Sequence, residues 1–394
     1  MPTLQTAHRV QKVKPSPTLA INARTTALKA KGHDIISMGV GEPDFDTPEH
    51  IKQAAIAAIN AGETKYTPVG GTAILKQAVI NKFLRDNQLS YTPAEVLVST
   101  GGKQSIFNLL QALINPGDEV IIPVPYWVSY PDMVLLAEGV PVLIPTDMQA
   151  NLKITATQLQ NTITKKTRLV FLNSPSNPSG LSYSAEELKQ LANVLLEYPD
   201  VMIATDDIYE HLFWKEKSFS NIVMVCPELK HRTIVLNGVS KAYSMTGWRI
   251  GYAGGPEWLI KAMTKIQSQS TSNPCSVAQA AAVEALNGPQ DCVTNMLQEF
   301  KKRHDYLVKR LQEMKGVRVL ESDGTFYSFP NVDEVIKNHG LSTDTELAEA
   351  LLDKGIAVVP GSAFGSPGYL RLSFTYSVAM LEKAMNRLEA GLAY

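Results

Sequence analysis

The sequence is poor in cysteine and has no excess of charge of either sign. Its 394 residues include three cysteines, Cys226, Cys275 and Cys292, and no CxxC spacing. An odd count without paired spacing argues against a disulfide framework, so we expect a reducing, cytoplasmic location. Lys and Arg number 37 against 38 Asp and Glu, a formal net charge of -1. Because no overall basic field is available to attract a polyanion, we expect no nucleic-acid partner.

Long apolar runs are also missing. No uninterrupted run approaches the roughly 18 residues of a membrane span, and the polar, basic start MPTLQTAHRVQKVK has no apolar centre. We therefore expect neither a membrane segment nor a standard secretion signal. The chain is not disordered in composition, because 44% hydrophobic residues at near-zero net charge can fill a core. Its length allows two or three domains.

Several catalytic signatures are absent. The seven histidines form no metal-ligand spacing and HExxH does not occur, so we expect no metal. A GxSxG elbow, the usual marker of an α/β-hydrolase, is missing. Neither GxGxxG nor GxxxxGK[ST] is found, which argues against a dinucleotide fold and against a P-loop.

Short apolar runs alternate with amphipathic stretches from about Ile51 onward. This rhythm is typical of βαβ units and predicts an α/β protein with a mostly parallel sheet. Helices are expected at 47–60, opened by Thr47 and Pro48, at 104–113 and at 184–196, opened by the capping box of Ser184 and Glu187. The predicted buried strands are 96–98, 120–122, 140–144, 169–172, 201–204, 234–236 and 250–253.

The sequence pattern changes after about Gly288, where we expect a long charged helix at 292–314. The pattern predicts that a second domain begins there. The first forty or so residues carry three prolines and few strong patterns, so we expect a flexible lead-in that could serve as a lid. The remaining predicted elements are strands at 318–320, 325–329, 356–359 and 369–374, and helices at 343–354 and from residue 377.

Polar groups follow the predicted strands at the ends where open α/β sheets bind ligands. After 96–98 come Gly101, Gly102 and Lys103, and a glycine pair at a helix start offers free backbone amides to an anion such as phosphate. Taken alone, an ordinary strand-to-helix turn explains the pair equally simply.

Three further segments that follow predicted strands carry candidate residues. Asn177 lies in a loop restricted by two X-Pro bonds, and Asp206 and Tyr209 follow the strand at 201–204. Asp206 could instead cap a helix. Lys241 follows the strand at 234–236 and is a candidate for a depressed pKa, although a solvated lysine is the simpler reading of it in isolation. Arg249, between two apolar residues, needs a carboxylate or a phosphate as partner.

The joint occurrence of these groups matches the needs of pyridoxal phosphate. The aldehyde of that cofactor needs a lysine, its phosphate needs amides and an arginine, and its pyridine nitrogen needs a carboxylate that keeps the ring protonated. Each requirement has an occupant among the residues that follow the predicted strands.

The motifs resemble those of the fold-type I aminotransferases, most closely the bacterial type that acts on aspartate and includes prephenate-using members. The resemblance covers nearly the whole chain and implies a three-layer fold. A mostly parallel sheet would lie in a large domain of residues 48–290, and a smaller α/β domain would combine residues 1–47 and 291–394. The resemblance rests on the segments KPSPT (14–18), GEPDFDTP (41–48), KYTP (65–68), STGGKQ (99–104), PYWVSYP (125–131), NSPSNPSG (173–180), DDIYEH (206–211), SKAYSMTGWRIGY (240–252) and RLSF (371–374).

The resemblance implies a role for each residue around the cofactor ring. Lys241 would hold the aldehyde covalently and then move the proton of the substrate Cα. Asp206 would pair with the pyridine nitrogen, Tyr209 and Asn177 would hydrogen-bond the ring hydroxyl, and Trp127 would stack on the ring.

The phosphate would lie on the first turn of a helix, according to the same resemblance. Its ligands would include Arg249 and Tyr66, the latter reaching from the other subunit, which implies a homodimer with shared active sites. The remaining residues expected at the phosphate are Gly101, Gly102, Lys103 and Ser240.

Substrate contacts follow from the resemblance too. Arg371 would clamp the α-carboxylate, helped by the backbone near Gly41, with Trp127 and Asn177 beside it. The stretch 267–273 has no arginine for a second carboxylate, so Lys103, with Lys14 and Thr18 from the N-terminal segment, would bind that group. Aspartate and glutamate are the expected amino donors. The expected acceptors are 2-oxoglutarate and oxaloacetate, with prephenate as the main alternative.

Two other functions remain open at this point. A pyridoxal-phosphate-dependent lyase would use the same set of residues around the cofactor. Lys103, which is expected to bind the distal carboxylate, argues against a lyase. Aminotransferase-like domains also serve as ligand sensors in transcription regulators. Those carry an added DNA-binding domain, and we expect none here because the cofactor motifs begin near Gly41.

Overall fold

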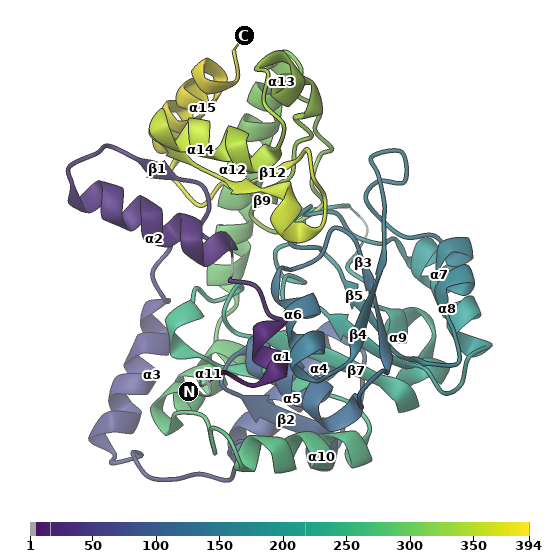
Figure 1. Ribbon diagram of the computed structural model, residues 1–394. Coiled ribbons are helices and arrows are strands. Elements are labelled where there is room, and N and C mark those ends of the chain that lie inside the picture. Colours follow the sequence, from purple (N-terminus) through teal and green to yellow (C-terminus); the bar gives the residue numbers. More distant parts are fainter. Residues whose placement is uncertain (1–4, 16, 217, 394) are drawn as a thin grey trace.

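The computed structural model describes residues 5–15, 17–216 and 218–393. Figure 1 shows a broad body built on a large sheet, with the C-terminal helices gathered in a second body above it. The seven-stranded sheet has the order β2-β8-β7-β6-β5-β3-β4. Its strands are β2 (Val96–Ser99), β3 (Glu119–Pro123), β4 (Val140–Ile144), β5 (Thr167–Asn173), β6 (Met202–Asp206), β7 (Thr233–Gly238) and β8 (Gly251–Gly254).

The sheet is mostly parallel, which confirms the predicted α/β class. Strands β4, β3, β5, β6 and β7 pair in parallel, whereas β8 runs antiparallel to both of its neighbours. All seven predicted strands are confirmed, and no end differs by more than two residues. The strand at 140–144 was expected to be buried, and this is wrong: it lies at the sheet edge, where two of its five side chains are exposed.

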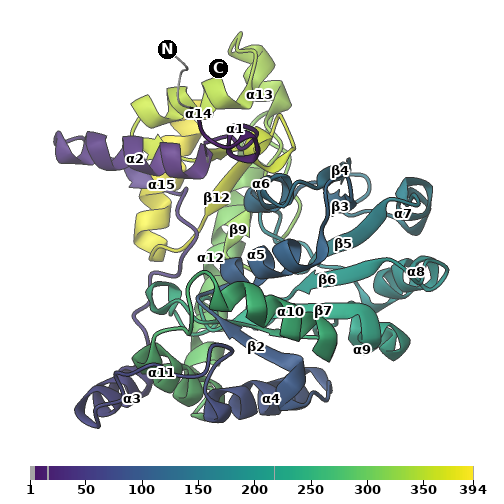
Figure 2. The ribbon, with the colours of Figure 1, turned by 60° about the horizontal axis from the view of Figure 1, so that its bottom comes forward.

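Helices cover both faces of this sheet and give a three-layer arrangement (Figures 1 and 2). Alternate residues of one strand enter different cores: Ile203 of β6 packs with one cluster, while Met202 and Ala204 pack with another. The helices of this body are α3 (Glu49–Asn60), α4 (Ala73–Asn87), α5 (Gly102–Leu113), α6 (Ser129–Leu136), α7 (Ala156–Thr162), α8 (Ala185–Leu196), α9 (Ile222–Val225), α10 (Glu257–Ser268) and α11 (Ser276–Asn287), with 3-10 turns η1 (Pro93–Glu95), η2 (Pro227–Arg232) and η3 (Thr246–Trp248).

The C-terminal body has its own apolar core, which includes Phe300, Leu307 and Leu351. Two small sheets belong to it, β1-β10 and β11-β12-β9. Its elements are α12 (Asp291–Glu313), β9 (Tyr327–Ser328), α13 (Asp333–Asn338), α14 (Asp344–Asp353), β10 (Ile356–Ala357), β11 (Val359–Pro360), η4 (Gly361–Phe364), β12 (Leu370–Ser373) and α15 (Val378–Leu392).

Two strand predictions in this body need correction. The strand expected at 318–320 is only a bridge between Arg318 and Asn331, because no second strand runs alongside it. The strand expected at 356–359 is split at Val358 into β10 and β11, which join different sheets. The predicted domain limits at residues 48 and 290 are not tested by these features and stay a prediction.

The N-terminal segment is more regular than expected. It forms α1 (His8–Gln11), α2 (Pro17–Ala30) and β1 (Ile36–Ser37), the last paired with β10. Pro17 is the first residue of α2, a position where the missing N–H of proline costs nothing, and helix formers follow it. An ion pair of 3.2 Å between Arg24 and Glu349 links α2 to α14. Whether the segment moves as a lid stays a prediction.

Helix starts were predicted with mixed success. The capping box of Ser184 and Glu187 is confirmed at the start of α8. The start expected at Thr47 is wrong, because α3 begins at Glu49 and the Thr47 hydroxyl donates 2.7 Å to the carbonyl of Ser244. Within the described parts of the chain, none of the helices combines the length and apolarity needed to cross a bilayer.

Candidate active site

A cavity of about 340 Å³ lies at the carboxyl ends of β5, β6 and β7 and is closed on one side by residues of the C-terminal body. Such a position at the strand ends is where open α/β sheets bind their ligands. The structure brings most of the predicted site residues together there: Thr18, Gly41, Gly102, Lys103, Trp127, Asn177, Asp206, Tyr209, Ser240, Lys241, Arg249 and Arg371 line it.

Three predicted site residues do not line this cavity. Gly101 lies behind Arg249. Lys14 is exposed, and its backbone N–H hydrogen-bonds Asp132. The side chain of Tyr66 is 93% exposed, so it cannot serve the cavity of its own subunit.

Lys241 follows β7 and points its ammonium at the main chain of the N-terminal segment. Its Nζ donates a hydrogen bond of 2.6 Å to the carbonyl of Gly41. Burial lowers the pKa of Lys241 to about 8 from 10.5; Glu42 opposes this shift, whereas Arg371 and Arg249 favour it. A neutral amine is therefore accessible close to neutral pH, as a nucleophile toward an aldehyde requires.

Asp206 ends β6 with a carboxylate that has no cation in contact among the described residues. Its Oδ2 accepts a hydrogen bond of 2.5 Å from the Tyr130 hydroxyl, and its Oδ1 accepts one of 3.4 Å from the N–H of Ile208. Burial raises the pKa of Asp206 to about 6, and the Tyr130 hydrogen bond opposes this shift. A buried carboxylate of this kind is well placed to hold a cationic ring nitrogen.

The first turn of α5 and Arg249 form an anion site. Gly101 has φ 82, and a Cβ on it would lie 2.2 Å from Nη2 of Arg249. Gly251 must also be small, since its Cβ would lie 2.2 Å from the N of Gly102. The glycines thus let a guanidinium lie against free backbone amides at a helix start, an arrangement that suits phosphate. Arg249 itself donates 2.8 Å to the carbonyl of Thr246.

Arg371 lies on β12 and is buried in the wall of the cavity. Its Nη1 donates 3.1 Å to Oδ1 of Asn177, and its Nη2 donates 2.7 Å to the carbonyl of Gly39. The guanidinium lies 4.5 Å from the ring centre of Tyr327. Its Nε is buried without a hydrogen-bond partner. The side chain keeps capacity for an incoming carboxylate.

Tyr209 and Tyr327 meet at the same wall, with 3.2 Å between their hydroxyl oxygens. Burial raises the pKa of both phenols, so they stay neutral and can donate hydrogen bonds. A Cβ on Gly41 would lie 2.4 Å from the Tyr327 hydroxyl, which explains the glycine there.

Lys103, Trp127 and Thr18 occupy another part of the cavity wall. The Nζ of Lys103 lies 5.0 Å from the ring centre of Trp127, a cation–π contact. Burial lowers the pKa of Lys103, and Arg249 adds to the effect. The Thr18 hydroxyl, brought in by α2, is buried without a partner. These groups form a polar corner in which an anionic substituent can be bound.

Sequence reasoning missed Tyr130, Tyr327 and Asn237, all of which line the cavity. Tyr130 could have been found, since it lies one helical turn after Trp127 in PYWVSYP. Asn237 could also have been found, since it directly follows the predicted strand at 234–236. Tyr327 left no such local signal.

The profile of the family "Aminotransferase class I and II" matches residues 33–388. The chain is 55% identical to an aspartate/prephenate aminotransferase of Nitrosomonas europaea, over 99% of this chain and all of that one. It is 48% identical to an aspartate aminotransferase of a Bacillus species, over 97% and 98% of the two chains.

Solved structures agree. The aspartate aminotransferase of Rhizobium meliloti superposes with a TM-score of 0.95 at 48% identity, over 99% of both chains. The Thermus thermophilus aspartate aminotransferase with maleate superposes with a TM-score of 0.93 at 40% identity, over 99% of this chain and all of that one. The chain belongs to the class I and II aminotransferase family, as the sequence motifs predicted.

Proposed function

We propose that the protein is a pyridoxal-phosphate-dependent aminotransferase. It transfers the amino group of L-aspartate or L-glutamate to 2-oxo acids such as 2-oxoglutarate or oxaloacetate, by a ping-pong mechanism. The observation that carries the proposal is one cavity that holds both an amine with a pKa of about 8, Lys241, and a buried carboxylate without a cation, Asp206.

The side chains present fit the proposed cofactor. Bound pyridoxal phosphate supplies an aldehyde for amino groups and a protonated ring that accepts electrons when the substrate Cα loses its proton. Lys241 would hold the aldehyde and later carry that proton, and Asp206 would keep the ring nitrogen protonated. Tyr209 and Asn177 would donate hydrogen bonds to the ring hydroxyl, and Trp127 would cover one ring face.

The phosphate contacts require a second subunit in this proposal. Gly102, Lys103, Ser240 and Arg249 would bind the phosphate from one chain, and Gly101 would leave room for the Arg249 guanidinium. A surface depression of about 860 Å³ opens directly beside Arg249. The 93% exposed Tyr66 of a second copy has the length and the polar tip to enter it, which supports a homodimer with shared active sites.

Substrate selection follows from two cationic groups in the cavity. Arg371 binds the α-carboxylate, with Gly41, Trp127 and Asn177 beside it. Lys103, helped by Thr18 and Lys14, binds the distal carboxylate. The Thermus relative with a four-carbon dicarboxylate, maleate, supports this reading, and the Nitrosomonas relative named for prephenate supports that acceptor as a second activity. A lyase is disfavoured, because Lys103 binds the distal carboxylate of the substrate, which a β-elimination does not need.

Two further parts of the proposal concern the chain as a whole. We divide it into a large domain of residues 48–290 and a small domain of 1–47 and 291–394. The separate sheets and cores of the two bodies support this division. A cytoplasmic location is supported by three unpaired cysteines, Cys226, Cys275 and Cys292, which fit a reducing compartment.

The test is a visible absorption spectrum of the purified protein. We expect a band of lysine-bound cofactor that L-aspartate removes and a 2-oxo acid restores. Adding 2-oxoglutarate or prephenate in parallel ranks the acceptors by the rate of restoration. A band that neither aspartate nor glutamate changes would contradict transamination of dicarboxylic amino acids, and no band after reconstitution would contradict the use of the cofactor.

A further inference from the structure

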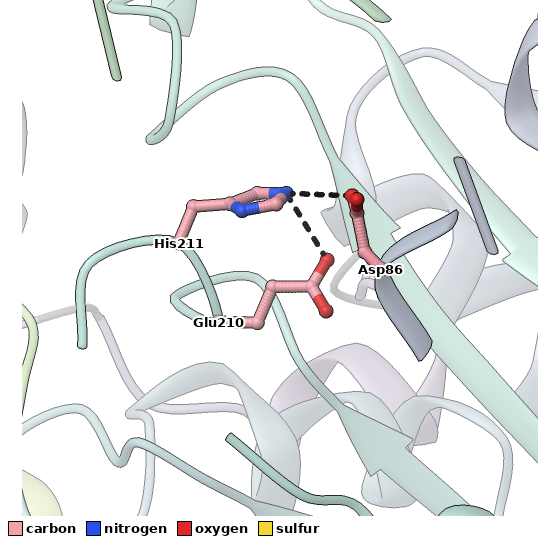
Figure 3. Close-up of side chains that lie close together, drawn as sticks. All are labelled: Asp86, Glu210 and His211. Atoms are coloured by element: carbon pink, nitrogen blue, oxygen red, sulfur yellow. Dashed lines mark ion pairs between the residues drawn. The ribbon is translucent and has the colours of Figure 1, made fainter. Parts of the chain in front are cut away.

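A charged cluster lies behind the wall of the cavity, on the side of α4; Lys82 and Glu210 are buried in it, and Asp86 and His211 are half-buried. Figure 3 shows three of its members, Asp86, Glu210 and His211. The Nε2 of His211 lies 3.3 Å from Asp86 and 3.5 Å from Glu210. The trio has the geometry of a metal site, but the ammonium of Lys82 already contacts Glu210. A lysine therefore supplies the positive charge that a metal ion would otherwise bring.

Both charges of the Lys82–Glu210 pair are fully removed from water. The Lys82 side chain is 0% exposed and the Glu210 side chain 3%. Lys82 also donates 2.7 Å to Oδ1 of Asn87, whose Nδ2 donates 2.7 Å to Oε2 of Glu210. The Oε1 of Glu210 accepts a further hydrogen bond of 2.7 Å from Nδ2 of Asn237. Every oxygen of this carboxylate is thus fixed by donors from other elements.

The position of Glu210 connects this cluster to the active site. Glu210 lies next to Tyr209 and four residues after Asp206, on the loop that follows β6. Asp206 and Tyr209 line the cavity, whereas Glu210 binds α4 on the other side of the loop. Asn237 lies near the end of β7, four residues before Lys241. The Asn237–Glu210 hydrogen bond therefore joins the two loops that carry Asp206 and Lys241.

Stability alone is a poor reason for this arrangement. A buried ion pair repays its desolvation cost only partly, and apolar residues of similar volume often stabilise a fold as well. The same region buries Asp207, whose pKa is raised to about 7 by burial and by the nearby Glu210. Lys82 offsets both carboxylates, so its loss would favour protonation of Glu210 and weaken the hydrogen bonds that join the loops.

We propose that Lys82, Glu210 and Asn237 are a positioning network that sets Asp206 and Tyr209 relative to Lys241. The inference rests on the proposed function, since it assigns these three residues their roles at the cofactor. Asn237 also lines the cavity, whereas the charged groups of the network, Lys82 and Glu210, do not line it and act on the cofactor through the loops.

The experiment compares two variants of the holoenzyme, Lys82→Met and Glu210→Gln, with a matched control. Arg232→Met removes another buried cation, which binds the carbonyls of Leu195 and Val201 at the opposite end of β7. The readouts are the pH midpoint of the visible cofactor band, the cofactor dissociation constant, the melting temperature, and kcat and KM for L-aspartate.

We expect Lys82→Met and Glu210→Gln to shift the pH midpoint of the band and to lower kcat by about tenfold to a hundredfold, the range for a small misplacement of reacting groups. KM should change little, because Arg371 and Lys103 are untouched. Arg232→Met should lower the melting temperature and leave the midpoint and kcat unchanged.

Three results would contradict either the positioning network or the proposed function. Loss of melting temperature in both network variants with an unchanged midpoint and kcat would show that the cluster is only structural. An equal midpoint shift in Arg232→Met would show a general effect of lost stability, and would also overturn the inference. If Lys82→Met does not fold, Glu210→Gln, which keeps the side-chain volume, decides alone. A wild-type protein without the cofactor band would contradict the proposed function instead.

Discussion

The hydroxyl of Tyr130 donates a hydrogen bond of 2.5 Å to Oδ2 of Asp206, and its ring stacks on Phe171 at 4.7 Å with 13° between the planes. The Tyr130 side chain is thus fixed at two points, by the stacking of its ring on Phe171 and by the hydrogen bond from its hydroxyl to Asp206. This donor opposes the burial that raises the pKa of Asp206 to about 6. The ionised state of Asp206 near neutral pH therefore depends on a residue 76 positions earlier in the chain.

Replacing Tyr130 by Phe should move the activity profile toward higher pH. Without the donor, the pKa of Asp206 rises further above its present value, so a higher pH is needed to ionise it. We expect kcat at neutral pH to fall by about tenfold to a hundredfold, consistent with roughly 1.5–3 kcal/mol for a hydrogen bond to a charged group. The measurement is kcat for L-aspartate against pH. Tyr126→Phe, four residues earlier, is the control; identical profiles for both variants would refute the role.

The cofactor-free protein should take up pyridoxal phosphate with a rate that rises through about pH 8. The pKa of Lys241 is lowered to about 8, so the folded protein loses this proton there, whereas an unfolded lysine keeps it until about 10.5. Between these values the folded state binds fewer protons, so the Lys241 contribution to stability increases as pH rises. Stopped-flow absorbance measures the rate. A midpoint near 10.5 would contradict the lowered pKa, and Lys241→Ala should show no covalent uptake.

Changing Gly101 to Ala should weaken cofactor binding specifically. The new Cβ would collide with Nη2 of Arg249, 2.2 Å away, and displace the guanidinium from the helix start. We expect the cofactor dissociation constant to rise at least about tenfold, as loss of a charge-assisted hydrogen bond implies. Gly117→Ala is the matched control, since Gly117 has a similar φ of 87 and open space around it. Equal weakening in both would mean that backbone strain alone is responsible.

Lys103→Ala should raise KM mainly for dicarboxylic substrates. Its Nζ lies over Trp127 in the cavity, and loss of one charge-assisted contact to a carboxylate should cost roughly 1.5–3 kcal/mol, about tenfold to a hundredfold in KM. Steady-state kinetics with L-aspartate and with L-alanine separate the effects. If KM rises equally for both substrates, Lys103 contacts the cofactor rather than the distal carboxylate.

Hybrid dimers should test the shared site. Tyr66→Ala should weaken cofactor binding, because the phosphate loses a donor from the second subunit, and Lys241→Ala should prevent covalent uptake. In a mixed dimer of the two variants, one site combines a native Lys241 with a native Tyr66. We expect that site to bind cofactor as tightly as the wild type, at up to half its capacity, in an absorbance titration. Only weak binding in the mixture would show that Tyr66 acts elsewhere.

Local sequence pattern was sufficient for much of the fold and for the first set of site residues. The central strands β6 and β7 consist of buried residues with short apolar centres, and their ends meet at one edge of a parallel sheet. Asp206 and Lys241 could therefore be assigned to a common site from their positions after 201–204 and 234–236. Capping at Ser184 was equally local, because the box spans only four residues.

Contacts between distant segments could not be predicted in this way. Thr47 was expected to cap α3, but its hydroxyl binds Ser244, 197 residues later. The strand expected at 318–320 did not form because a strand also needs a partner that its own sequence does not specify.

The sequence by itself determined the α/β alternation, the strand ends and the residues that follow them, because these depend on periodicity and on turns of a few residues. Only the tertiary structure decided that Tyr130 supports Asp206, that Tyr327 meets Tyr209, and that Lys82 on α4 joins the loops of Asp206 and Lys241 through Glu210. These pairings arise from the packing of elements far apart in the chain, where burial selects partners that no local pattern encodes.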